Sequence, residues 1–245
     1  MLRSRDLPGD PITTSPKNLA RIAGILYLLL VGAAFNEGFV LSRIVKSGNA
    51  QATADNIRSS ATLFRLGFLG DLTAATFWLL TAMALYLLLK HVNQLAAAAM
   101  VTFAAVGAAI MTLNQLNQYT ALTVATGDDY TRAFGRAGSD VLTLVFADMQ
   151  HNGYLIDEMF FGLWLLPLGY LVIRSGYFPK VLGVLLTVAC FGYLAALFTV
   201  VLAPDLGTSV TLFVTVPAAA AGELTFMLWL LIKGVRVPDL TGQHA

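Results

Sequence analysis

Residues 181–204 read VLGVLLTVACFGYLAALFTVVLAP, and this stretch contains no Asp, Glu, Lys or Arg. The stretch from Val92 to Gly127 is also free of these four residue types. A helix at a protein–water boundary alternates apolar and polar faces, because one side meets solvent. A run of about 20 apolar residues instead matches the roughly 30 Å hydrocarbon core of a bilayer at about 1.5 Å per residue. Both stretches therefore predict transmembrane helices.

The composition of the whole chain supports this interpretation. Hydrophobic residues make up 57% of the 245 residues and charged residues 12%, with a mean hydropathy of +0.73. Soluble domains carry about 25% charged residues. The net charge of +1 gives no basic surface for nucleic acid. The single cysteine, Cys190, lies in an apolar stretch and has no partner for an intrachain disulfide.

Six apolar runs predict an all-α fold, a polytopic bundle of six transmembrane helices with short amphipathic surface helices in the outer loops. The spans are expected at residues 19–41, 63–89, 95–124, 153–173, 181–203 and 208–232, within a membrane domain of residues 18–235. Residues 1–17, with three prolines, are expected to form a disordered cytoplasmic tail, and residues 236–245 a C-terminal tail. The first run is long for a signal peptide and is interpreted as a span.

The segment between the third and fourth spans has a mixed pattern. Residues 125–140 are polar and are expected to form a loop. After it, Leu142, Val145, Phe146 and Met149 recur at helical spacing. This pattern predicts an amphipathic helix that either lies on the membrane surface or leads into the fourth span. Pro167 and Pro217 fall inside spans and are expected to kink them.

The basic residues predict the orientation, because cytoplasmic loops are enriched in Lys and Arg. With the N-terminus inside, nine basic residues fall on the inner side: Arg3, Arg5, Lys17, Arg21, Lys90, Arg174, Lys180, Lys233 and Arg236. Six fall on the outer side: Arg43, Lys46, Arg58, Arg65, Arg132 and Arg136. Both termini are therefore expected in the cytoplasm.

Polar residues inside the spans carry the main functional hint, because ionisable groups in a membrane helix are costly and usually face the bundle interior. Helical rise places a polar set from four spans at a similar outer depth, where it is predicted to line one outward-opening cavity: Glu37, Arg65, Asp71, Asn114, Asn117, Gln118, Asp157 and Glu158. Structural readings stand beside this one. The amides could form interhelical hydrogen bonds, Arg65 could extend to the membrane surface, and the two acids could favour a helix N-terminus.

Two further candidates concern ions. Asp148, His151 and Glu158 share a helix face, so a His-plus-carboxylate metal site is an alternative, although no cofactor is otherwise expected. Glu223 is the acid nearest the middle of the membrane, about ten residues before Lys233. It is a candidate proton or cation site, the alternative being a protonated side chain that donates one structural hydrogen bond.

Several stretches resemble an uncharacterised bacterial membrane protein family, domain of unknown function 4386 (DUF4386). The most specific stretch begins at Arg174-Ser175-Gly176-Tyr177 and continues through Phe178-Pro179-Lys180 to Leu185. Weaker similarities include Arg21-Ile22-Ala23-Gly24, Leu63-Phe64-Arg65-Leu66-Gly67 and the closing Trp229 to Gly234. The resemblance covers about residues 19–235 and implies a multi-pass protein of the bacterial cytoplasmic (inner) membrane. It implies no chemistry.

Three functions remain open from the sequence. The first is a non-enzymatic protein that binds or passes a small solute or lipid through the outer polar cavity. The second is a membrane-embedded, metal-dependent hydrolase at Asp148, His151 and Glu158. The third is an accessory or scaffold subunit of a membrane complex. The expected partners are the lipid bilayer and a small ligand, with no nucleic acid, and the sequence predicts no oligomeric state.

Overall fold

The computed structural model describes residues 15–236, and within this range every regular element is a helix. Most of the two tails predicted at residues 1–17 and 236–245 lies outside the described residues. Six helical segments are long and apolar enough to cross a membrane: Pro16–Ile44, Ala61–Leu89, Gln94–Thr126, Asp128–Arg174, Lys180–Leu202 and Pro204–Ile232. The predicted all-α bundle of six transmembrane helices is therefore confirmed.

Several of these segments consist of more than one helix. The first contains α1 (Pro16–Ala33), the π-helical η1 (Asn36–Leu41) and α2 (Ser42–Ile44). The short helix α3 (Ala50–Ser59) precedes α4 (Ala61–Leu89) and α5 (Gln94–Thr126). The fourth segment contains α6 (Asp128–Leu163) and α7 (Leu165–Arg174), and the fifth is α8 (Lys180–Leu202). The sixth contains α9 (Pro204–Val210), η2 (Thr211–Thr215), α10 (Val216–Ala219), η3 (Ala220–Leu224) and α11 (Thr225–Ile232).

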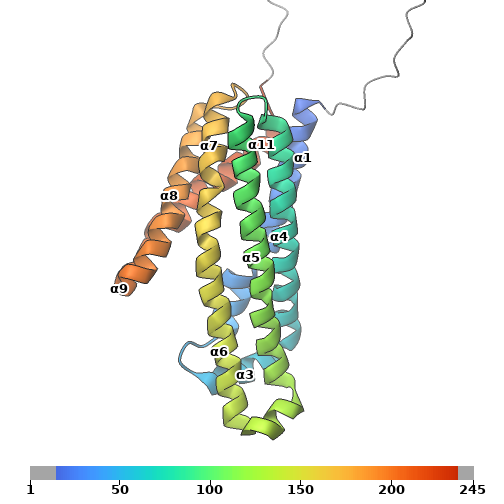
Figure 1. Ribbon diagram of the computed structural model, residues 1–245, viewed down its shortest axis with the longest axis vertical. Coiled ribbons are helices and arrows are strands. Elements are labelled where there is room, and N and C mark those ends of the chain that lie inside the picture. Colours follow the sequence, from blue (N-terminus) through green and yellow to red (C-terminus); the bar gives the residue numbers. More distant parts are fainter. Residues whose placement is uncertain (1–14, 237–245) are drawn as a thin grey trace, which may run out of the picture.

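The helices form an elongated bundle in which α4, α5 and α6 run side by side as long rods (Figure 1). Helix α1 packs along α4 and against α11, while α7 packs along α8. The start of α1 and the end of α11 lie at the same end of the bundle, which we call the proximal end (Figure 1). The other half is the distal half. At the end of α8 the chain turns into α9, and this turn stands away from the long rods (Figure 1).

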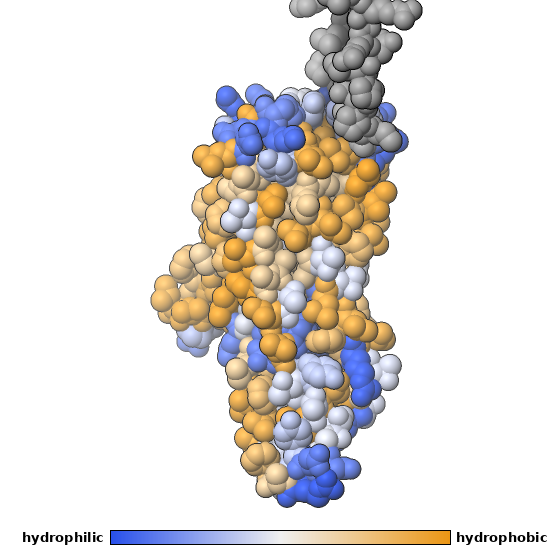
Figure 2. Space-filling view, turned by 45° about the vertical axis from the view of Figure 1, so that its right-hand side comes forward, coloured by the Kyte–Doolittle hydropathy of each residue, from blue (hydrophilic) through white to orange (hydrophobic). Residues whose placement is uncertain are grey.

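Helix lengths show how far the distal half extends past the end of α8. With 23 residues, α8 spans about 34 Å, close to the thickness of the hydrocarbon core. The 33 residues of α5 span about 50 Å. The distal ends of α4, α5 and α6 therefore extend well beyond the level at which α8 turns into α9. Figure 2 agrees, because an apolar band covers much of the bundle while polar side chains gather at both ends.

Close packing of α7 on α8 depends on two glycines. A Cβ atom on Gly169 would lie 2.7 Å from the carbonyl oxygen of Gly183, and one on Gly183 would lie 2.5 Å from the carbonyl oxygen of Gly169. Both distances are far below ordinary van der Waals contact. Small residues of this kind let membrane helices approach closely, since apolar burial does not drive their association in lipid.

Both intramembrane prolines interrupt their helices, as expected. Pro167 has no N–H to donate to Leu163, and the helix breaks at Trp164 between α6 and α7. Pro217 lies in α10, between the π-helical segments η2 and η3. A π-helical turn accommodates one extra residue and is frequent at functional sites. The first segment has such a turn as well, η1, which carries Asn36 and Glu37.

The expected polar loop at residues 125–140 is wrong. Helix α6 already begins at Asp128 and bends at Gly135, whose φ of 72° and ψ of 165° are not helical. The amphipathic pattern that follows is part of α6 and leads directly into the fourth span. Its Thr143 and Gln150 are buried, whereas Val145 and Met149 are exposed. The sequence pattern could not show this continuity, because polar residues at a helix start also occur in loops.

Ion pairs fasten the amphipathic helix α3 to the distal end of the bundle. Arg58 contacts the carboxylates of Asp55 and Asp140 and donates from Nε to the carbonyl oxygen of Ala125 at 2.6 Å. Arg136 pairs with the same two acids. Asp140 is nearly fully buried, so its charge requires these arginines. This cluster links α3, α5 and α6 and serves a structural role.

Candidate functional site

Polar side chains from α4, α5 and η1 meet in a buried cluster in the distal half. The cluster, which we call the amide network, consists of Asn36, Asp71, Gln115 and Gln118. Asn36 Nδ2 donates to Asp71 Oδ2 and to Gln118 Oε1, both at 2.7 Å, and Gln115 Nε2 donates to Asp71 Oδ2 at 2.8 Å. Gln118 Nε2 donates to Asn36 Oδ1 at 3.3 Å and to the carbonyl oxygen of Phe64 at 3.0 Å. The network therefore ties three helices together.

The backbone of α4 leaves room for the central member of this network. A Cβ atom on Gly67 would collide with Asn36 Oδ1 and would lie 3.2 Å from Val40 Cγ1. Asn36 itself is fully buried. The fit is close and the hydrogen bonds are mutual, so the amide network is a packed structural element.

The two asparagines of α5 have a similar structural part. Asn114 Nδ2 donates to the carbonyl oxygen of Gln150 at 2.7 Å, and Asn117 Nδ2 donates to Asn114 Oδ1 at 3.0 Å. Gly153 of α6 faces Asn114 so closely that a side chain there would collide with the amide. The bond from Asn114 joins α5 to α6, whereas the bond from Asn117 lies within α5. The structural reading, interhelical hydrogen bonding, therefore describes Asn114.

Acidic residues converge elsewhere, on a cavity of about 660 Å³ between the long rods and the α8–α9 turn. We call it the distal cavity. Its polar wall includes Glu37, Asp71, His151 and Glu158, and its opposite wall includes the apolar Val200, Pro204, Leu212 and Val216; the remaining lining residues are Ala34, Gly38, Met111, Tyr154, Leu155, Phe161, Gly207 and Thr211. Because Val200 and Pro204 flank the end of α8, the cavity lies level with that membrane boundary.

Only some of the polar groups in this wall have hydrogen-bond partners. Glu37 Oε1 lies 3.0 Å from His151 Nδ1, and Gln150 Nε2 lies 3.5 Å from Glu37 Oε2. The side chain of His151 is 59% exposed and that of Glu37 is 27% exposed, so solvent reaches this wall. Glu158 is only 7% exposed, yet its Oε2 has no hydrogen-bond partner among the described residues. A buried carboxylate oxygen without a partner on a cavity wall is an acceptor available to a ligand.

The structure separates the remaining predicted site residues from this wall. Arg65 is exposed and lies beside Phe68 and Tyr119 in a different surface depression. Asp157 is buried on another face of α6, and neither of its carboxylate oxygens has a partner within residues 15–236. Asn114 and Gln118 take part in helix–helix contacts, Asn117 bonds to Asn114 within α5, and none of the three lines the cavity. Of the eight residues expected in one cavity, Glu37, Asp71 and Glu158 line it.

The candidate metal residues do not assemble into a metal-binding group. Among the described residues, no three His, Cys, Asp or Glu side chains are placed to hold one ion. His151 faces Glu37, and both line a neighbouring depression together with Asp148. Glu158 does not line this depression, so the three predicted ligands are not gathered at one place.

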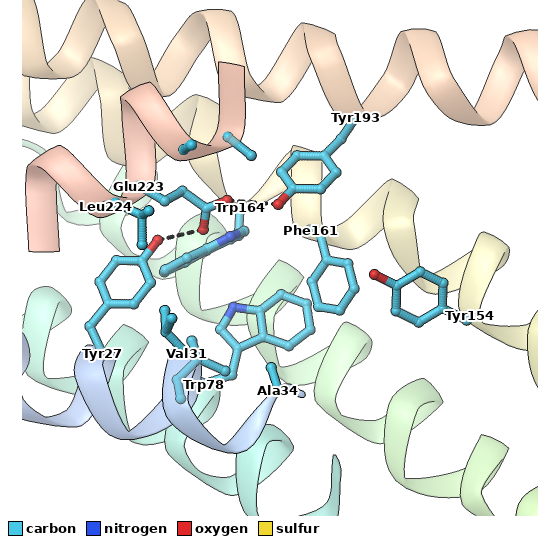
Figure 3. A pocket seen from close by; sticks show the side chains of 13 residues that line it. Tyr27, Val31, Ala34, Trp78, Tyr154, Phe161, Trp164, Tyr193, Glu223 and Leu224 are labelled. Atoms are coloured by element: carbon cyan, nitrogen blue, oxygen red, sulfur yellow. Dashed lines mark hydrogen bonds between the residues drawn. The ribbon is translucent and has the colours of Figure 1, made fainter. Parts of the chain in front are cut away.

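Glu223 lies in a second cavity, of about 340 Å³, which we call the aromatic cavity (Figure 3). Tyr27 donates from its hydroxyl to Glu223 Oε2 at 2.5 Å, and Tyr193 donates to Oε1 at 2.8 Å. Six of the thirteen lining residues are aromatic: Tyr27, Trp78, Tyr154, Phe161, Trp164 and Tyr193. Ala34, Tyr154 and Phe161 line both cavities, so the two are neighbours.

Comparison with known proteins assigns the chain to a family. The profile of the family described as Domain of unknown function (DUF4386) matches residues 22–234, which is nearly the whole membrane domain. The chain belongs to the DUF4386 family. The resemblance stated from the sequence is thereby confirmed.

Other comparisons with this DUF4386 chain add no biochemical activity. An uncharacterized protein of Archaeoglobus fulgidus is 31% identical over 161 residues, which cover 65% of this chain and 78% of the relative. No solved structure matches the chain. The site in this DUF4386 protein is therefore argued from its own geometry.

Several residues outside the eight predicted to line one cavity lie at these sites. Asn36 and Gln115, polar residues in the same outer part of the spans, complete the amide network, and Tyr27 and Tyr193 hold Glu223. Asn36 offered a signal, since a buried amide next to Glu37 needs partners. The tyrosines offered none, because an aromatic residue in an apolar run is expected to pack against lipid or other helices.

Proposed function

We propose that this DUF4386 protein binds or passes a small, positively charged solute through the distal cavity, which opens outward in the predicted orientation. The observation that carries the proposal is the convergence of Glu37, Asp71, His151 and Glu158 on one cavity. These residues come from η1, α4 and α6, so only the folded bundle brings them together.

The charge of the wall supports a cationic solute. Three of the four ionisable residues are carboxylic acids, and the sixteen lining residues, all within the described range, include no Lys or Arg. A cleft lined by one sign of charge with low-dielectric walls concentrates ions of the opposite sign. The apolar wall at the α8–α9 turn accommodates the carbon skeleton of an organic cation.

A pair of cysteine variants tests this proposal. Leu155 lines the distal cavity, whereas the adjacent Ile156 is 59% exposed on the outer surface of α6. Cys190 is buried and is the single native cysteine, so the native chain supplies no exposed thiol. Purified Leu155→Cys and Ile156→Cys proteins in lipid nanodiscs are treated with methanethiosulfonate reagents that carry either a trimethylammonium or a sulfonate group.

At Leu155→Cys we expect the cationic reagent to react about tenfold faster than the anionic one, relative to the same ratio at Ile156→Cys. In intact cells, the impermeant cationic reagent added outside should label Leu155→Cys. Equal rate ratios at the two positions, or labelling only after the membrane is broken, would contradict an outward-opening, cation-selective cavity.

A further inference from the structure

We infer that the aromatic cavity is a binding site for a small organic ammonium ion, which reaches it through the distal cavity. The walls of this cavity come from α1, α4, α6, the turn at Trp164, α8, α10 and η3. Tyr27, Trp164 and Tyr193 lie around Glu223, and Phe161 lies between this group and Tyr154 (Figure 3). The inference rests on the proposed function for the path of the ligand. The chemistry of the site itself is argued from its own contacts.

The aromatic rings form a connected wall. The ring centroids of Trp78 lie 4.7 Å from Phe161 and 6.0 Å from Trp164, and those of Tyr27 and Trp164 are 5.7 Å apart. Phe161 in turn lies 6.1 Å from Tyr193. The faces of Trp, Tyr and Phe attract cations within about 6 Å of the ring centroid, and several rings around one cavity favour quaternary ammonium groups.

Charge balance at Glu223 favours the same ligand. None of the thirteen lining residues, which all belong to the described part of the chain, is Lys, Arg or His. Tyr27 and Tyr193 donate to the two carboxylate oxygens, but neutral hydroxyls supply no positive charge. An ionised acid within a membrane bundle is normally paired with a positive charge. A bound ammonium ion would provide it.

The aromatic cavity also contains a hydrogen-bond donor without an acceptor. Trp78 is fully buried and lines the cavity, and its indole Nε1 has no acceptor within residues 15–236. An indole N–H can only donate. An ammonium compound that carries a hydroxyl or carbonyl oxygen would pair with Glu223, and a small shift of the side chains that now cover Trp78 Nε1 would let this oxygen accept from the indole.

The same features disfavour an inorganic cation. A hard ion such as Ca²⁺ takes six to eight oxygen ligands. The polar lining side chains of the aromatic cavity are one carboxylate, three tyrosines and two tryptophans, while the rest of its surface is carbon. A volume of about 340 Å³ instead suits a compact organic cation with several methyl groups.

The two cavities share Ala34, Tyr154 and Phe161 as lining residues. An ammonium ion attracted by Glu37, Asp71 and Glu158 would therefore reach Glu223 by passing Tyr154 and Phe161. The acids of the distal cavity would raise the local concentration of the cation, and the aromatic cavity would select its chemistry.

Binding of radiolabelled choline and tetraethylammonium to the purified full-length protein in detergent tests the inference. We expect saturable binding of at least one of the two. The matched competitor is dimethylbutanol, the uncharged carbon isostere of choline, which should compete at least about tenfold more weakly because it lacks the cation. Glu223→Gln should weaken binding about tenfold or more. Asp205→Asn, which neutralises an exposed acid on the same membrane segment, should leave binding unchanged.

Two checks separate binding from folding. The thermal unfolding midpoint of each variant shows whether it is folded, and Trp78→Leu provides a second variant that removes one ring and its N–H. Trp78→Leu should weaken the binding of choline more than that of dimethylbutanol. Equal competition by the isostere, no saturable binding of either cation, or unchanged binding in both folded variants would overturn the inference.

The cysteine experiment on Leu155 distinguishes this failure from failure of the proposed function. A retained preference for the cationic reagent, without binding of either ammonium ion, would end the inference about the aromatic cavity alone. Loss of that preference would end the proposed function as well.

Discussion

Asn36 and Glu37 are neighbours in the chain, yet they belong to two different environments. Asn36 is fully buried in the amide network, where it bonds Asp71 and Gln118. Glu37 faces the distal cavity, where it contacts the exposed ring of His151. The π-helical turn η1 carries both residues. One set of polar groups thus holds helices together, and the other faces open space.

The difference shows how to separate structural from functional polar residues in a membrane protein. In the amide network every fully buried side-chain polar atom except Gln115 Oε1 has a hydrogen-bond partner. On the cavity wall, Glu158 keeps an oxygen without a partner. Asp71 belongs to both regions, since it accepts two amide hydrogen bonds and also lines the cavity. Substitutions in the two regions should therefore differ in their effect on stability.

The largest effect is expected for Asn36→Leu. It removes the donor to both Asp71 and Gln118 and leaves their buried oxygens with fewer partners, so the free energy of unfolding should fall by about 3 kcal/mol. Unfolding in mixed detergent micelles measures this change. The control is Asn117→Leu, because Asn117 is only half-buried and bonds to one side chain; it should cost less than about 1 kcal/mol. Equal losses in the two variants would mean that the network does not stabilise the bundle.

Gly67→Ala should destabilise the protein by about 2 kcal/mol, because the new methyl group would collide with the Asn36 amide and force the network apart. Gly32→Ala is the matched control. No atom lies within 4 Å of a Cβ at Gly32, so this helical variant should be neutral or more stable by up to about 1 kcal/mol. Thermal unfolding midpoints rank the two variants. A stable Gly67→Ala protein would show that Asn36 is loosely packed.

Asp157→Asn should stabilise the protein, in contrast to the two substitutions above. Both carboxylate oxygens of Asp157 are buried without partners in the described structure, and an uncharged amide costs less to bury. We expect stabilisation of about 1 kcal/mol in the same unfolding assay. The exposed Asp148→Asn on the same helix should change stability by less than about 0.5 kcal/mol. Destabilisation by Asp157→Asn would reveal a partner for this acid.

The smallest effect on stability is expected for Glu158→Gln, within about 0.5 kcal/mol, because one of its oxygens makes no hydrogen bond. Its effect should appear at the cavity. In the Leu155→Cys background the preference for the cationic thiol reagent should fall about threefold, because loss of one unit charge several ångströms away, in an aqueous cavity screened by salt, slows the cationic reagent and speeds the anionic one by just under about twofold each. An unchanged preference in a folded variant would place the charge of Glu158 outside the cavity.

Much of the architecture could be predicted from the sequence because hydrocarbon thickness dictates the length of each apolar run. The six spans and the breaks at Pro167 and Pro217 follow from that constraint and from the missing proline N–H. The helical character of residues 128–140 could not be predicted, since polar residues there form ion pairs with the distant Arg58. Such pairing depends on the tertiary fold.

The site was only partly predictable for a related reason. Helical rise predicted a similar depth for Glu37, Asp71 and Glu158, which line one cavity, and depth is a property of the local sequence. The rotation of each helix about its axis is set by its neighbours, and it separates Arg65 and Asp157 from the cavity. The aromatic residues of the cavity around Glu223 come from four different spans, so the spacing of residues within a single span could not indicate this cavity.

The most direct test of the central claim combines Glu37→Gln and Glu158→Gln in the Leu155→Cys protein and measures the ratio of cationic to anionic reagent rates in nanodiscs. If these acids line a shared cavity that attracts cations, the ratio should fall most of the way to that of Ile156→Cys, with Asp71 retaining the remainder, while Ile156→Cys itself should be unaffected by the same two substitutions. A ratio that stays high in the folded double variant would contradict the account, because the attraction would then come from other parts of the molecule.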